Sequence, residues 1–126
     1  MEMIIGGAYQ GKTEYAKEQY PKTEWISGTS ATEEELMKTR GITDFQEYIR
    51  RELKEGKDVS DLAGRLRNNN PDIIIVSQEV GYGVVPVDAF DRKYREAVGR
   101  VCTELALQSR KVTRVVCGIG TVIKDA

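Results

Sequence analysis

The sequence predicts an α/β domain in which helices flank a mostly parallel β-sheet. Short apolar runs rich in β-branched residues alternate with segments of helical spacing, which is the pattern of strands joined by crossover helices. Residues 73–76 are apolar and β-branched throughout, as expected of a strand buried on both faces. The chain of 126 residues has no internal repeat or linker, so we expect one compact domain over residues 1–126.

The first part of the chain predicts two strands around one helix. Residues 1–5 form an apolar strand that ends at two glycines. Residues 13–20 form a helix that Pro21 stops, and residues 24–27 form a weak second strand.

Three helical segments are predicted between residues 32 and 69. Thr32 with Glu35 has the form of a capping box, and Gly41 is the expected stop of the first helix. Thr43 with Gln46 repeats this start signal for the second helix. The apolar faces are Phe45, Tyr48, Ile49 and Leu53, closed by Gly56, and then Val59, Leu62, Ala63 and Leu66.

The last part predicts a long helix and a final strand. Asp88 is the expected N-cap of that helix, and residues 112–117 form an interior strand, with a short return at Val122 and Ile123. The inward side of the helix consists of Phe90, Tyr94, Ala97, Val98, Val101, Cys102 and Leu105. Cys102 and Cys117 have no disulfide or metal-ligand spacing, and we expect buried thiols.

The composition excludes several classes of function. With 19 basic and 20 acidic residues the net charge is -1, which argues against a protein that coats nucleic acid. No apolar run could cross a bilayer and no leader opens the chain, so we expect a cytoplasmic protein without a membrane partner. The sequence contains no histidine, which excludes a Ser-His-Asp triad, a histidine-ligated zinc and a nucleotidyl-histidine intermediate.

A phosphate-binding loop follows the first strand. Its residues are Gly6, Gly7, Ala8, Tyr9, Gln10, Gly11, Lys12 and Thr13, which match the Walker A pattern G-x-x-x-x-G-K-[ST]. Glycines let backbone N–H groups turn inward toward a phosphate, and the N-terminus of the next helix favours the same anion. Lys12 is expected to reach the β- and γ-phosphates, and the Thr13 hydroxyl to ligate Mg²⁺. The pattern predicts a site for a nucleoside triphosphate, ATP or GTP, and it does not distinguish the two.

Glu79 is the acid expected to work with this loop. It follows the strand at 73–76, and ligands of parallel α/β sheets gather at the carboxyl ends of the strands. Asp72 lies at the opposite end of that strand and is the poorer candidate. Glu79 would hold Mg²⁺ or accept the proton of an acceptor hydroxyl, and the alternative is an exposed loop carboxylate.

The segment after Glu79 resembles a known family. Residues 79–86 read Glu-Val-Gly-Tyr-Gly-Val-Val-Pro, residues 92–96 read Arg-Lys-Tyr-Arg-Glu, and Gly99 and Arg100 follow. This order is similar to the cobinamide kinase/cobinamide-phosphate guanylyltransferase family, whose Gly-Gly-x-Arg-Ser-Gly-Lys-Ser loop resembles residues 6–13. The resemblance extends over residues 1–20 and 71–124, a little over half of the chain.

This resemblance implies a P-loop NTPase-like (RecA-like) α/β fold, often assembled as a trimer, in an enzyme of late cobalamin synthesis or salvage. The family phosphorylates the aminopropanol hydroxyl of adenosylcobinamide with a nucleoside triphosphate, and then uses GTP through a guanylylated histidine. By position, residues 6–13 would hold phosphates and Glu79 would be the strand-end acid. The substrate-binding residues would be Gly81, Tyr82 and Gly83 of the adjoining loop, with Arg92 and Arg95, which without the family read as a solvated helix face.

The sequence departs from the family in ways that bear on activity. Without histidine the guanylylated intermediate cannot form, and the segment that would carry it is missing after the second strand. Tyr9 and Gln10 replace Arg and Ser, while Gln78 and Cys102 each replace Asn. We therefore expect a cobinamide kinase-like phosphotransferase, self-associated because a small sheet leaves apolar faces to cover, that has lost the guanylyltransferase activity. The alternatives are a non-catalytic nucleotide- or corrinoid-binding module of the same family, and an unrelated small NTPase.

Overall fold

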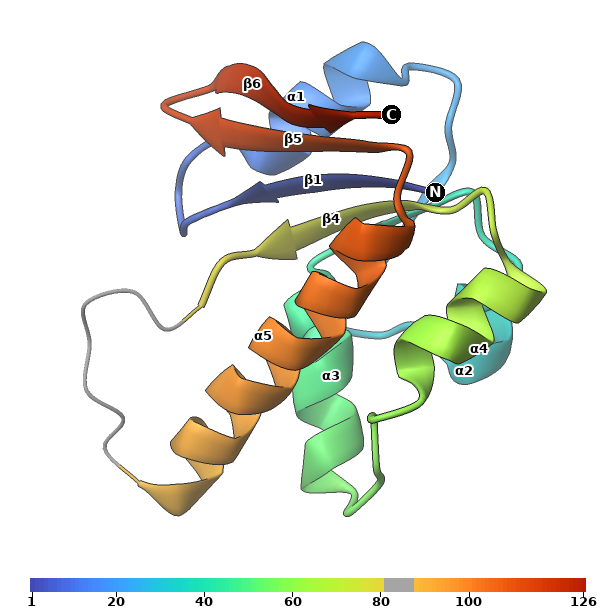
Figure 1. Cartoon of the computed structure of the whole chain (residues 1–126), viewed down its shortest axis with the longest axis vertical. Helices are drawn as coiled ribbons and strands as arrows, with labels where there is room; N and C mark the ends of the chain where they lie inside the picture. The colour runs from blue at the N-terminus through green and yellow to red at the C-terminus, as the bar shows by residue number, and fades with distance from the viewer. Residues whose placement is uncertain (81–87) are drawn as a thin grey trace.

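A six-stranded sheet with helices on both faces organises the part of the chain that the computed structural model describes, residues 1–80 and 88–126 (Figure 1). Its strands are β1 (Glu2–Gly6), β2 (Trp25–Ser27), β3 (Gly41–Thr43), β4 (Ile74–Gln78), β5 (Lys111–Val116) and β6 (Ile119–Asp125). Its helices are α1 (Lys12–Gln19), α2 (Glu33–Leu36), α3 (Phe45–Lys54), α4 (Leu62–Asn69) and α5 (Ala89–Gln108). The predicted α/β class is confirmed.

The strand order is β2-β3-β4-β1-β5-β6, and every neighbouring pair is parallel except β5 with β6. Helix α1 covers one face, and α3, α4 and α5 cover the other (Figure 1). Successive residues of β4 point to opposite faces, so Ile74 and Val76 pack under α1 while Ile75 joins the larger core. This two-sided burial explains why the strand is β-branched throughout, as predicted.

Several local signals act as expected. The Thr32 hydroxyl accepts from the N–H of Glu35, whose carboxylate accepts from the N–H of Thr32, which completes the capping box. Asp88 caps α5 by accepting from the N–H of Asp91. Gly56 follows the end of α3 with a positive φ of 76°, as a helix stop requires.

The expected helix stop at Gly41 is wrong, because Gly41 begins β3, a strand that the sequence analysis missed. Gly41 is paired with Trp25 of β2, and a Cβ at this position would lie 2.5 Å from the indole ring. The glycine therefore makes room for the tryptophan across the strand pair. A three-residue strand opened by glycine has too little apolar alternation to be recognised.

The predicted helix start at Thr43 and Gln46 is also wrong. Thr43 is the last residue of β3, and α3 begins two residues later. The Gln46 side chain instead accepts from the backbone N–H of Gln78 at 2.9 Å. It replaces the strand partner that β4 loses where β3 turns away into α3.

The β5–β6 hairpin is longer than the short return that was predicted. Its turn places Cys117 and Gly118 at φ 51° and 75°, the conformation of two-residue hairpin turns. Cys117 is exposed, so the expectation of a buried thiol is wrong there. Cys102 is half-buried against the core, and burial raises the pKa of its thiol to about 11.

Among the described residues, no helix combines the length and the apolar character needed to cross a bilayer.

We predict that Gly41→Ala lowers the free energy of unfolding by about 1–3 kcal/mol, because the new methyl group overlaps the Trp25 ring. Gly64→Ala in α4 is the matched control, since its Cβ meets no atom within 4 Å, and we expect a gain of up to ~1 kcal/mol from helix propensity. Urea denaturation measures both. Equal unfolding free energies for the two variants would contradict the packing argument.

Candidate functional site

The carboxyl ends of β1, β4 and β5 meet at one edge of the sheet, at the left of Figure 1. Gly6 at the end of β1 is paired with Gln78 at the end of β4. The carbonyl of Gly6 also accepts a hydrogen bond from the N–H of Glu79 at 2.7 Å. The loop at residues 6–13 and Glu79 therefore leave the sheet side by side.

The loop bends through two left-handed residues before α1 begins. Tyr9 has φ 60° and Gly11 has φ 79°, and a Cβ on Gly11 would lie 3.3 Å from the Cα of Gly118. Ala8 and Tyr9 form a turn, and within the described part of the chain the backbone N–H groups of residues 11–13 donate to no acceptor. A row of free N–H groups that ends at a helix N-terminus has the chemistry of an anion site.

The loop is tied to the β5–β6 turn through Gln10. The Gln10 carbonyl accepts from the N–H of Gly118 at 2.8 Å, and the Gln10 side chain accepts from the N–H of Cys117 at 2.7 Å. These bonds use the acceptors of Gln10 and leave the loop N–H groups unpaired. Gln10 is therefore a structural residue of the loop.

Lys12 is buried, with 8% of its surface exposed, and its ammonium donates to the carbonyl of Gly7 at 3.3 Å. No carboxylate of the described residues forms an ion pair with it. Burial lowers the pKa of Lys12, while the charges of Asp44 and Glu14 act in the opposite direction. An anion bound on the loop would strongly stabilise this ammonium, because the ammonium is desolvated and makes one long hydrogen bond to a carbonyl.

Glu79 is not an exposed loop carboxylate. Its side chain is 12% exposed, and Arg114 of β5 binds both of its oxygens, Nε to Oε1 at 3.0 Å and Nη2 to Oε2 at 3.2 Å. A planar guanidinium that grips a carboxylate at two points sets its orientation as well as its position. Glu79 is therefore a rigidly held acid at the edge of the loop.

A cavity of about 460 Å³ opens beside the loop. Of the predicted site residues, Gly7, Ala8, Glu79 and Arg95 line it. Arg95 pairs with Asp91 at 3.1 Å on the opposite wall. The structure thus brings one predicted arginine of α5 to the same cavity as the loop and the acid.

The other predicted site residues that the structure describes do not line this cavity. Arg92 is exposed on α5, and the Tyr9 side chain is fully exposed. Thr13 is half-buried in the first turn of α1. Gly81, Tyr82 and Gly83 lie outside the described residues.

Arg50 and Arg114 belong to the site but were not predicted. The Arg50 guanidinium lies 5.3 Å from the ring centre of Tyr94 and 5.9 Å from that of Phe90, and it lines the 460 Å³ cavity. The helical spacing around Arg50 does not indicate that its side chain faces Phe90 and Tyr94 of α5. A charged residue inside a strand is the signal that could have identified Arg114.

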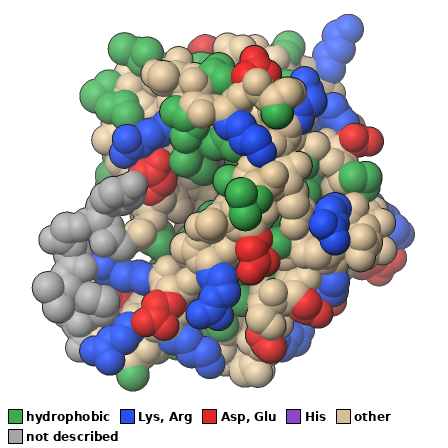
Figure 2. Space-filling model, in the orientation of Figure 1, with side chains coloured by type: hydrophobic (Ala, Val, Ile, Leu, Met, Phe, Trp, Pro, Cys, Tyr) green, Lys and Arg blue, Asp and Glu red, His purple; other side chains and the backbone are tan. Residues whose placement is uncertain are grey.

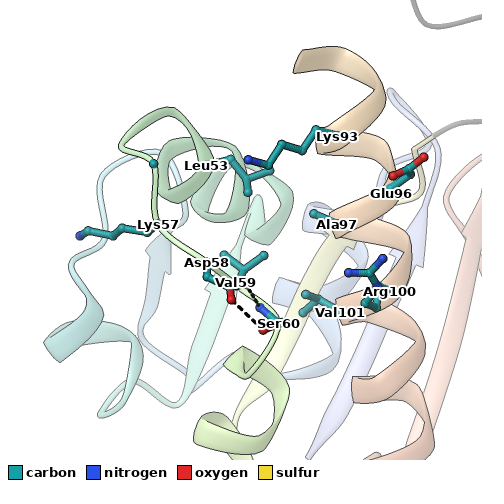
Figure 3. Close-up of a pocket in the computed structure, with 11 residues that line it drawn as sticks. Leu53, Lys57, Asp58, Val59, Ser60, Lys93, Glu96, Ala97, Arg100 and Val101 are labelled. Atoms are coloured by element: carbon teal, nitrogen blue, oxygen red, sulfur yellow. Dashed lines mark hydrogen bonds between the residues drawn. The ribbon is translucent and has the colours of Figure 1, made fainter. Parts of the chain in front are cut away.

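Two more cavities flank α5. One of about 280 Å³ has Glu79 at its rim and an apolar wall that includes Ile5, Val98 and Val112. The other, of about 210 Å³, lies between α5 and the loop after α3, with Lys57, Lys93 and Arg100 among its charged groups (Figure 3). No residue of the phosphate loop lines this last cavity, so its position does not relate it to the predicted chemistry.

The oxygen donors at the sheet edge suit Mg²⁺ better than softer metals. Thr13 offers a hydroxyl, and Asp44 and Glu79 offer carboxylates. Among the described residues no three His, Cys, Asp or Glu side chains gather as a metal cage. Mg²⁺ needs no such cage, because it keeps water and phosphate ligands beside one or two carboxylates.

The chain is similar to known proteins of one family. The sequence model of the family described as cobinamide kinase / cobinamide phosphate guanyltransferase matches residues 29–123. The bifunctional adenosylcobalamin biosynthesis protein CobU of Escherichia coli is 32% identical over 81 residues, which cover 64% of this chain and 45% of the relative. CobU of Salmonella typhimurium is 42% identical over 52 residues, 41% of this chain and 29% of the relative. This chain therefore spans less than half of each relative, and it belongs to the cobinamide kinase / cobinamide phosphate guanyltransferase family.

Proposed function

We propose that this chain binds a nucleoside triphosphate, ATP or GTP, on residues 6–13 and transfers its γ-phosphoryl group to the aminopropanol hydroxyl of (adenosyl)cobinamide. The observation that carries the proposal is the loop itself, in which backbone N–H groups without partners adjoin the buried ammonium of Lys12. Family membership supplies the acceptor, because the relatives act in adenosylcobalamin biosynthesis by name.

The chain's own groups have distinct roles in the proposed transfer. The N–H groups of residues 8–13 hold the phosphate chain, and Lys12 offsets negative charge that builds on the transferred phosphoryl oxygens. The Thr13 hydroxyl would help to hold Mg²⁺, which would supply positive charge to offset that of the phosphates. None of these steps uses histidine.

Glu79 is the residue proposed to contact the acceptor. It borders both the 460 Å³ cavity and the apolar cavity beside α5, so an acceptor with a polar arm and an apolar body could fill both. We expected Glu79 either to hold Mg²⁺ or to accept the proton of the substrate hydroxyl. Its double contact with Arg114 favours the second, since one fixed carboxylate oxygen can still accept a hydrogen bond.

The guanylyltransferase reaction of the bifunctional relatives is proposed to be absent from this chain, because no histidine is present to carry the nucleotide. One observation favours a second candidate, a non-catalytic nucleotide- or corrinoid-binding module. Arg114 contacts both oxygens of Glu79, and an acid held in this way could serve the structure of a binding protein instead of a reaction.

Self-association, with a trimer as in the family, is part of the proposal. Leu107, Ile119 and Ile123 are 76%, 70% and 57% exposed, with Val116 and Val122 nearby in sequence and about half exposed. Figure 2 shows hydrophobic side chains over the β5–β6 end of the molecule.

Light scattering should give a multiple of the 14.1 kDa chain mass, and a monomer at all concentrations would contradict this.

We predict that Lys12→Ala weakens triphosphate binding by about tenfold or more, because a charge-assisted contact to phosphate is lost. Isothermal titration with ATP and with GTP measures the effect. Lys17→Ala is the matched control, an exposed lysine on the same helix, and should bind like the parent. Unchanged affinity in Lys12→Ala would refute the phosphate-loop assignment.

We predict that Glu79→Gln lowers cobinamide-dependent release of nucleoside diphosphate by about a hundredfold while nucleotide affinity is retained. The amide keeps the shape of the side chain but removes the charge that orients the acceptor. Glu96→Gln, on the exposed side of α5, serves as the control. If Glu79→Gln turns over like the parent, Glu79 has no part in the transfer.

A further inference from the structure

Arg50 is a cation of the cavity beside the phosphate loop, and the sequence predicts no role for it. It lies on α3, which packs against α5 (Figure 1), and its side chain is half-buried. Gly7, Ala8 and Glu79 line the same cavity of about 460 Å³. Arg50 and the start of the loop therefore border one open space.

Helix α3 is fixed to the edge of the sheet one turn before Arg50. The buried side chain of Gln46 accepts from the N–H of Gln78, the residue that is paired with Gly6 at the end of β1. Residues four apart on a helix lie on the same face, so Arg50 follows Gln46 on the side of α3 that meets the ends of the strands. The position of Arg50 relative to the loop is therefore set by the sheet.

Two aromatic rings hold the Arg50 guanidinium and leave its N–H groups open. The guanidinium lies 5.3 Å from the ring centre of Tyr94, which is buried, and 5.9 Å from that of Phe90. A guanidinium stacked on rings uses its flat faces, while its five N–H donors point outward in its plane. Within residues 1–80 and 88–126, no carboxylate pairs with Arg50 and no acceptor takes a hydrogen bond from it.

The acids of the cavity do not neutralise this cation. Asp91 is paired with Arg95, and Glu79 is paired with Arg114. Glu47 also lines the cavity, and it forms no ion pair with any described residue. A half-buried guanidinium with open donors is stabilised by an anion that enters the cavity, because each N–H bond to an anion is charge-assisted.

The geometry of the loop indicates which anion this would be. The Lys12 ammonium donates to the carbonyl of Gly7 at 3.3 Å. The lysine of such a loop reaches the β- and γ-phosphates of a nucleotide, so the terminal phosphate of a bound triphosphate would lie beside Gly7. Gly7 lines the cavity that Arg50 borders. The γ-phosphate is therefore the part of the nucleotide expected to enter this cavity.

We propose that Arg50 binds the γ-phosphate of the nucleoside triphosphate from across the cavity, so that this phosphate lies between the Arg50 guanidinium and the Lys12 ammonium. This inference rests on the proposed function, because it requires a triphosphate on residues 6–13. Arg50 is then the residue that distinguishes a triphosphate from a diphosphate, since a diphosphate has no group that reaches it.

The test compares the affinities of triphosphates and diphosphates. The non-hydrolysable β,γ-imido analogues of ATP and GTP, and ADP and GDP, are titrated with magnesium chloride into the parent and the variants. The parent should prefer the analogue of one triphosphate to its diphosphate. Arg50→Met should weaken binding of that analogue by about tenfold or more and keep the affinity for the diphosphate.

The choice of variants separates the charge of Arg50 from its packing. Methionine keeps an apolar stem against the two rings and removes the charge. Arg50→Gln should give the same result, and it replaces Arg50→Met if that variant does not fold by circular dichroism. Lys54→Met is the matched control, because it removes one positive charge from an exposed position of the same helix outside the cavity. Glu47→Gln changes the cavity without removing a cation, and both controls should keep the preference for triphosphate.

The outcomes distinguish the two proposals. A preference for triphosphate that survives in Arg50→Met and Arg50→Gln overturns the assignment to Arg50, as does an equal loss for triphosphate and diphosphate. A similar loss of preference in Lys54→Met or Glu47→Gln also overturns it. A parent that binds triphosphate and diphosphate equally overturns it as well but leaves the phosphate loop in place. A parent that binds none of these nucleotides refutes the proposed function, and the assignment to Arg50 with it.

Discussion

The parallel register of β1 and β4 is the constraint on which the candidate site depends. Pairing of Gly6 with Gln78 makes the phosphate loop and Glu79 leave the sheet at one level. A slip of one residue would turn the side chains of β4 to the other face, and a slip of two would move Glu79 by roughly 7 Å along the strand. Burial of β4 between two apolar layers opposes both slips, so the hydrophobic core determines where the polar site lies.

The loop itself is held from two sides of the sheet edge. Glu79 and the β5–β6 turn bind its backbone carbonyls, while its N–H groups and the Lys12 ammonium are left poorly satisfied. A triphosphate would satisfy these groups together.

Much of this arrangement could be predicted from the sequence because the strong signals are local. The two-sided burial of β4, the caps at Thr32 and Asp88, and the position of the loop between a strand and a helix all follow from short patterns. The missed features depend on distant partners. Gly41 is a strand residue because Trp25 packs on it, and Arg114 matters because Glu79 follows the end of β4, which lies two strands away from β5 in the sheet. No local pattern contains that information.

The absence of histidine separates two reactions that the bifunctional relatives combine, and leaves phosphoryl transfer as the central claim. Mass spectrometry of cobinamide, incubated with the purified chain, Mg²⁺ and each triphosphate, tests this claim most directly. The account predicts a product heavier by one phosphoryl group and no nucleotidyl adduct. Triphosphate that binds without any phosphorylated cobinamide, or is hydrolysed at the same rate when cobinamide is left out, would contradict it.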